Sequence, residues 1–149
     1  MCSSDLSLSF HLTASGLRFF SGEKLLKVPV GGGAPIEICA ASSGRGGYWG
    51  SDGTIFLSPI ARGGGIARVS ENGGDLKETS KLDEGSGETS HRMPILLPNN
   101  KAILYTAYGA AYQDVNIIAQ DSDSGQRKVL VPGGSQPRIA TIGDATYLL

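Results

Sequence analysis

The chain has 149 residues, enough for one domain with a buried core, and its net charge of -1 gives no basic surplus for binding nucleic acid or an anionic membrane. Glycine occurs 22 times while only 18% of the residues are charged, and the apolar runs are far shorter than the roughly 20 residues that span a bilayer. Two cysteines are too few for a disulfide framework. Without a collagen-like period, this much glycine among short apolar bursts indicates many tight turns between strands.

The first six residues differ in character from the rest of the chain. Cys2-Ser3-Ser4-Asp5-Leu6 reads like the translation of a sequencing adapter, so we expect residues 1–6 to be a non-native segment. They have neither the basic nor the apolar region of a secretory signal. At the other end the chain stops within an expected strand, so we expect residues 7–149 to be an incomplete domain.

Short apolar segments between turn residues then predict strands along the whole chain. No stretch keeps a helical apolar stripe free of Gly or Pro. Strands are expected near 6–10, 17–21, 24–29, 35–39, 46–50, 54–58, 65–70, 75–79, 91–97, 101–107, 114–120, 127–131, 136–140 and 145–149. The predicted fold is therefore all-β.

These strands recur in groups. The order of strand, hairpin turn and strand repeats at about 40–50 residues, the period of four-stranded propeller blades. Asp52-Gly53 and Asn99-Asn100 supply residues that tolerate positive φ in the tight turns, as do Gly73-Gly74 and Ser124-Gly125. We expect a partial β-propeller of about three four-stranded antiparallel blades plus half of another. The expected blades lie near 7–40, 45–80, 90–132 and, in part, 135–149.

Three motifs carry a resemblance to a known family. Gly-Arg-Gly-Gly-Tyr-Trp-Gly-Ser-Asp-Gly-Thr-Ile at 44–55, Gly-Glu-Thr-Ser-His-Arg-Met-Pro at 87–94 and Leu-Pro-Asn at 97–99 resemble the TolB-like, WD-repeat-like β-propeller. They are most similar to the version that follows the catalytic domain of bacterial receptor-type serine/threonine kinases. Met93 stands where that family has Trp, and Asn99-Asn100 replaces Asp-Gly. The resemblance implies structural blade roles for Trp49, Asp52, Gly53, Met93, Pro94 and Pro98.

The resemblance also implies a function. It points to a non-catalytic segment that binds a protein or a small-molecule ligand in the sensory region of such a kinase, in an extracytoplasmic or periplasmic location. Its expected partners include the remaining blades of its own parent chain, but neither nucleic acid nor a membrane. One alternative is a propeller segment that gates a prolyl-oligopeptidase-type hydrolase, where similar repeats occur. Another is a purely structural repeat array.

Candidate reactive motifs do not meet the requirements of catalysis. His91-Arg92-Met93 differs from a kinase catalytic loop because Met93 cannot act as a base and Pro98 occupies the Asn position. Ser90 and His91 are adjacent on an expected strand, so their side chains point to opposite faces. We therefore expect no catalytic residue.

Candidate metal and cofactor motifs are equally incomplete. The segment 121–125, Asp-Ser-Asp-Ser-Gly, lacks the later ligands and flanking helices of a calcium loop and favours a hairpin turn. The glycine-rich segments 31–33, 44–47 and 63–65 lack the helix that a phosphate-binding loop needs. We expect neither a metal nor a cofactor.

A binding rim is the remaining candidate site. Arg45, Glu88, His91 and Arg92 precede or begin expected innermost strands, where propellers present polar groups to ligands. The alternative is that Glu88 and the arginines pair with each other or with neighbouring blades.

Overall fold

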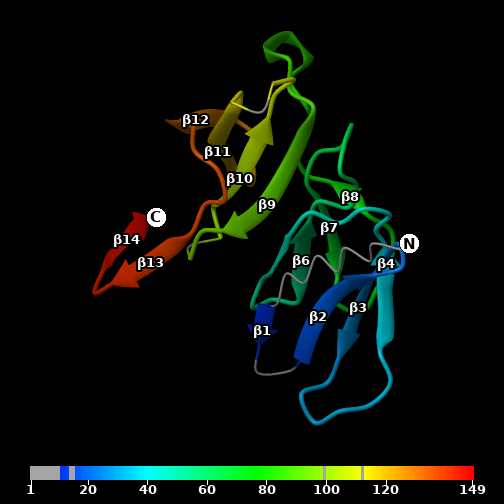
Figure 1. Cartoon of the computed structure of the whole chain (residues 1–149). Coiled ribbons are helices and arrows are strands. Elements are labelled where there is room, and N and C mark those ends of the chain that lie inside the picture. Colours follow the sequence, from blue (N-terminus) through cyan, green and yellow to red (C-terminus); the bar gives the residue numbers. More distant parts are fainter. Residues whose placement is uncertain (1–10, 14–15, 99, 112) are drawn as a thin grey trace.

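A computed structural model of the chain describes residues 11–13, 16–98, 100–111 and 113–149 (Figure 1). These residues form strands and turns, and the one helical element among them is a short 3-10 helix, η1 (Glu84–Ser86). The all-β prediction is therefore confirmed. The segment 1–6 and the strand expected near 6–10 lie outside the described residues.

Three four-stranded antiparallel sheets follow one another along the chain, each with its strands in sequence order. The first sheet contains β1 (His11–Thr13), β2 (Gly16–Ser21), β3 (Lys24–Val28) and β4 (Ile36–Ala40). The second contains β5 (Gly47–Trp49), β6 (Thr54–Leu57), β7 (Ala67–Ser70) and β8 (Lys77–Glu78). The third contains β9 (Ser90–Leu96), β10 (Ala102–Tyr108), β11 (Val115–Asp121) and β12 (Arg127–Pro132).

A separate two-stranded hairpin ends the described chain. It consists of β13 (Ile139–Ile142) and β14 (Ala145–Leu148) and extends away from the four-stranded sheets (Figure 1). Every strand expected from 17–21 onward overlaps one that is observed.

The tight turns have the backbone geometry that their sequences predict. Gly53 has a φ of 79° and donates its N–H to the carbonyl of Gly50 at 3.1 Å, which closes the turn between β5 and β6. Asn100 has a φ of 57°, in the left-handed region that Asn tolerates better than most residues. Such tight turns reverse the direction of the chain within a few residues, so consecutive strands pair.

The second sheet is buried on both faces. Because alternate residues of a strand point to opposite sides, one strand of this sheet contributes to two cores. In β6, Ile55 and Leu57 belong to a cluster shared with the first sheet, whereas Phe56 belongs to one shared with the third. The first cluster also contains Phe20, Leu25, Ile38, Cys39, Ala41, Trp49 and Val69. The second also contains Ile66, Leu96, Ile103, Tyr105, Ala107 and Ile118.

The first strands of the three sheets lie next to one another. β1 contacts β5, and β5 in turn contacts β9. This arrangement places β1, β5 and β9 on the inner side of the stacked sheets, so residues that precede or begin these strands gather at shared junctions. In the described part of the chain, no helix is long and apolar enough to cross a membrane.

Candidate functional site

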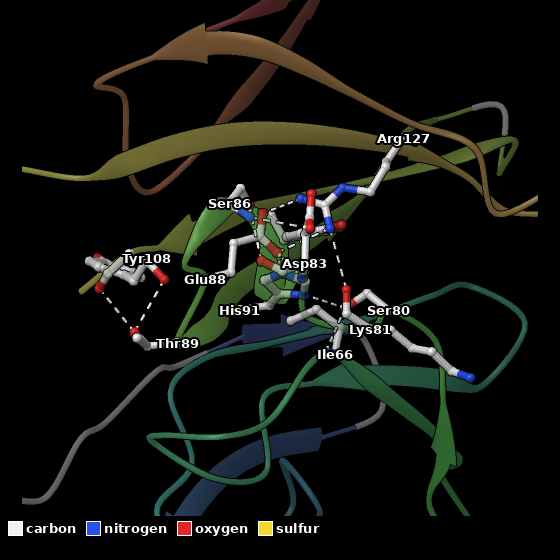
Figure 2. A network of polar contacts seen from close by, with 12 residues as sticks. Ile66, Ser80, Lys81, Asp83, Ser86, Glu88, Thr89, His91, Tyr108 and Arg127 are labelled. Carbon is white, nitrogen blue, oxygen red and sulfur yellow. Dashed lines mark hydrogen bonds and ion pairs between the residues drawn. The ribbon is translucent and has the colours of Figure 1, made fainter. Parts of the chain in front are cut away.

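The segment that links β8 to β9 carries a network of polar contacts at the seam between the second and third sheets (Figure 2). The network joins Ser80, Glu88 and His91 from this segment and the start of β9 to Arg127 at the start of β12. Glu88 and His91 are two of the four predicted rim residues. Ser80 and Arg127 were not predicted.

His91 is the centre of the network and is fully buried. Its Nδ1 lies 2.7 Å from the Ser80 hydroxyl, and its Nε2 lies 2.8 Å from a carboxylate oxygen of Glu88. The Ser80 oxygen already accepts the backbone N–H of Ile66 at 2.8 Å, so its own hydrogen is available to donate to Nδ1. We therefore assign the imidazole as the neutral tautomer that donates from Nε2 to Glu88.

The Glu88 carboxylate is saturated with donors, although its side chain is only 9% exposed. Arg127 reaches both of its oxygens in a forked ion pair, and the backbone N–H of Asp83 donates to it at 2.7 Å. Arg127 also donates to the carbonyl of Lys81 at 3.3 Å. Asp83 in turn caps η1 by accepting from the N–H of Gly85 and of Ser86. The loop before β9 is thus fixed against the outermost strand of the third sheet.

The protonation states of Glu88, His91 and Tyr105 follow from their burial and from these hydrogen bonds. Burial by itself raises the pKa of Glu88, but the hydrogen bonds from Arg127, from the Asp83 backbone and from His91 outweigh it and hold that pKa below its usual value. Burial lowers the pKa of His91, and Glu88 offsets this only in part. Burial also raises the pKa of Tyr105, whose ring centroid lies 4.5 Å from that of His91, to about 12. At neutral pH the network therefore holds a carboxylate, a guanidinium, a neutral imidazole and a neutral phenol.

Ser80, His91 and Glu88 stand in the order of hydroxyl, imidazole and carboxylate that nucleophilic triads use. The geometry differs from a working triad in two ways. Ser80 is only 1% exposed, and one lone pair of its oxygen is occupied by the Ile66 N–H. A substrate carbonyl has no access to this oxygen, so the three residues act as a hydrogen-bonded clasp between two sheets.

Ser90, the other hydroxyl beside His91, takes no part in this clasp. Its oxygen accepts the Nε of Arg92 at 3.0 Å, as expected for a neighbour on the opposite face of the strand.

Further bonds join the second and third sheets along the same seam. Gln120, at the end of β11, donates to the carbonyl of Thr79 at 2.7 Å and accepts from the Tyr105 hydroxyl at 3.0 Å. The backbone N–H of His91 donates to Gly64, and that of Gly63 donates to Thr89. Directional bonds from several elements therefore fix how these two sheets meet.

The other two rim residues lie together at the junction of β5 with β9. The Arg45 carbonyl accepts the Met93 N–H at 3.0 Å. Arg92 donates from Nη2 to the carbonyl of Ala61 at 2.9 Å, and its guanidinium lies 4.4 Å from the centroid of the Tyr108 ring. The four predicted residues thus divide into a buried pair, Glu88 with His91, and a half-buried pair, Arg45 with Arg92.

The residues predicted to have blade roles occupy turns and core positions. Asp52 accepts the Thr54 N–H at 3.0 Å in the β5–β6 turn. Trp49 is 7% exposed and stacks under the guanidinium of Arg18, which lies 3.5 Å from its ring centroid. Pro94 is fully buried, whereas Pro98 is exposed. Met93 has a φ of 52°, which sequence reasoning did not anticipate.

The segment 121–125 forms a hairpin turn, as predicted. The Asp121 carboxylate accepts the backbone N–H of Asp123 at 3.1 Å and of Ser124 at 2.7 Å, so it caps its own turn. Within the described ranges, no group of three or more His, Cys, Asp or Glu side chains could hold a metal ion.

The comparisons with known proteins identify the architecture. No protein-family model matches the chain, and no curated protein sequence matches it. Among solved structures, the chain is similar to the crystal structure of TolB from Acinetobacter baumannii, with a TM-score of 0.68 and 15% sequence identity. The match covers 96% of this chain but only 40% of that one. The described sheets therefore form part of a TolB-like β-propeller, and the prediction of a partial propeller is confirmed.

Proposed function

We propose that this chain is a non-catalytic propeller segment that binds a partner, a protein or a small-molecule ligand, at the inner junction of its second and third blades. The observation that carries the proposal is the state of Arg45 and Arg92 at that junction. The buried Nε of Arg45 has no hydrogen-bond partner, and Arg92 uses only part of its donor capacity within the described chain. Unsatisfied donors at a junction of inner strands favour a binding role.

The buried clasp supports the non-catalytic part of the proposal. Its only hydroxyl, imidazole and carboxylate bond to one another and to the neighbouring sheet. We expect the chain to hydrolyse an activated ester no faster than its Ser80→Ala variant does. Ester hydrolysis that disappears in Ser80→Ala, at equal folded fraction, would instead show that Ser80 reacts.

A site-specific cross-linking experiment tests the binding part. A photoreactive residue replaces exposed Ile60, beside Ala61 at the junction, or exposed Asp123, in the β11–β12 turn. In the parent protein within its source cells, the first position should give a discrete cross-linked species and the second should not. Equal labelling from both positions, or none from either, would contradict binding of a protein at this junction.

The finer proposal is that the parent is a bacterial receptor-type serine/threonine kinase and that this segment belongs to its extracytoplasmic sensory region. It rests on the motifs at 44–55 and 87–94. The coding sequence on either side of this segment tests it. A kinase domain followed by one apolar span upstream supports the proposal, whereas a hydrolase nucleophile elbow downstream would assign the segment to a prolyl-oligopeptidase-type enzyme.

A further inference from the structure

Three segments that each carry an arginine meet at the junction of β5 and β9. Arg45 precedes β5, and its carbonyl accepts the N–H of Met93, the residue after Arg92. Arg92 donates to the carbonyl of Ala61, the residue before Arg62. Two hydrogen bonds therefore tie the three segments together, and we call Arg45, Arg62 and Arg92 the arginine cluster.

The guanidinium of Arg92 is held in a fixed orientation. Its Nε donates to Ser90 and its Nη2 to Ala61, while the ring of Tyr108 lies against it. The backbone beside it is irregular, because the pairing of β9 with β10 shifts register opposite Tyr105 and Met93 adopts a positive φ. Bulges of this kind re-aim side chains and are common beside binding sites. Arg92 is thus positioned before any ligand arrives.

No acidic side chain neutralises the cluster within the described residues. None of the ion pairs there involves Arg45, Arg62 or Arg92, and Glu88, three residues before His91, is already committed to Arg127 and His91. Burial lowers the pKa of Arg92, Tyr108 opposes this, and the positive charges of Arg45 and Arg62 lower it further. The Nε of Arg45 is buried without a partner. Three like charges that act on one another, one of them with an unpartnered donor atom, lack a counter-anion within the described residues.

We propose that the arginine cluster binds a phosphate group, either as inorganic phosphate or as a monoester. The inference deepens the proposed binding function and rests on it. A carboxylate has two oxygens and pairs with one guanidinium in a fork, whereas a phosphate presents more oxygens and up to two negative charges. Three segments that each supply an arginine can offer more than one guanidinium to a ligand, which matches the second kind better, as in other arginine clusters that recognise phosphorylated motifs.

Calorimetric titration of the 149-residue chain with inorganic phosphate tests the proposal. The ionic strength is held constant with chloride, because salt screens exposed charges. We expect saturable binding of one phosphate, competition by phosphoserine, and no competition by acetate at the same concentration. Phosphoserine binding more tightly than inorganic phosphate indicates a monoester ligand, and the reverse order indicates the free anion.

Two charge-removing variants provide the comparison. Arg62→Gln, at an exposed residue of the cluster, should weaken phosphate binding at least tenfold. Arg68→Gln removes the same charge from an exposed position on β7 and should leave binding within twofold. Equal weakening by both variants, effective competition by acetate, or no saturable binding overturns the phosphate site. If a partner is cross-linked from position 60 but any of these results is obtained, the binding function stands and the phosphate site does not.

Discussion

Replacing Ser80 by Ala tests the clasp most directly, because this hydroxyl holds two buried groups at once. It accepts the Ile66 N–H and donates to Nδ1 of His91, and all three residues are at most 1% exposed. The substitution removes one oxygen and leaves an amide N–H and an imidazole nitrogen buried without partners. Each such group costs about 1–3 kcal/mol, so we expect a loss of about 2–6 kcal/mol in the free energy of unfolding.

Urea unfolding followed by circular dichroism measures this loss, with Trp49 fluorescence as a second probe. The chain has a single tryptophan, which lies in the core shared by the first and second sheets, so the fluorescence reports on a different seam. Ser51→Ala is the matched control, since that serine is exposed in a turn and should change stability by less than about 0.5 kcal/mol. A loss below about 1 kcal/mol for Ser80→Ala would refute the reasoning that both bonds are made in the folded chain.

Three further substitutions test other parts of the fold. Trp49→Ala should lower the free energy of unfolding in urea by about 3–5 kcal/mol, because Trp49 is a core residue. Tyr147→Ala, at a half-exposed ring, should lower it by less than about 1 kcal/mol. Similar losses for the two variants would mean that Trp49 is not a core residue. Gly65→Ala should lower the free energy of unfolding by about 1–3 kcal/mol, because a Cβ at position 65 would overlap the Ser80 carbonyl. Gly31→Ala, which has open space around it, should leave stability unchanged. An unchanged stability for Gly65→Ala would refute the packing of Gly65 against Ser80. The folded chain holds the pKa of Glu88 below 4.5 and that of His91 below 6.5, so both groups bind protons more readily when unfolded. Stability should be full above about pH 6.5 and fall as the pH drops below 6.5 and then 4.5; Glu88→Gln should flatten the lower part of this fall, and an unchanged pH profile would contradict the assignment.

Local sequence signals were enough to predict the strands, because each depends on residues close together in the chain. Gly53 closes its turn by a positive φ that glycine adopts freely, and this fixes where β5 ends and β6 begins. The segment 121–125 caps itself through Asp121, again a local effect. Strand alternation alone predicted that Ser90 and His91 point to opposite faces, and the structure agrees, since Ser90 bonds to Arg92.

The partners within the site depend on packing between sheets, which the sequence does not display. Glu88 bonds to Arg127, 39 positions along the chain, and nothing local distinguishes this arginine from the others. Ser80 reaches His91 only because the second sheet packs on the third. The one available signal was a histidine near the start of a strand that continues as an apolar run, since a buried imidazole requires partners for both nitrogens. The positive φ of Met93 was equally hidden, as it comes from a register shift between β9 and β10.

The two seams between the sheets differ in a way that predicts separate roles. The seam of the first and second sheets consists mainly of the apolar cluster around Trp49, with the Arg18 guanidinium stacked on its ring, and apolar contact is not directional. The seam of the second and third sheets adds the directional bonds of Glu88, His91 and Arg127 to the Gln120–Thr79 bond and two backbone bonds. Buried polar groups often add little stability over apolar replacements, so our hypothesis is that this clasp specifies alignment. The triple variant Glu88→Leu, His91→Leu, Arg127→Met should then keep its unfolding free energy within about 2 kcal/mol of the original chain. If the clasp specifies alignment, its amide NMR spectrum should show doubled peaks for residues of β9, because the Gln120–Thr79 bond and the two backbone bonds that remain would then not hold a single alignment. A single sharp set of peaks from the stable triple variant would show that apolar packing alone determines how these blades meet.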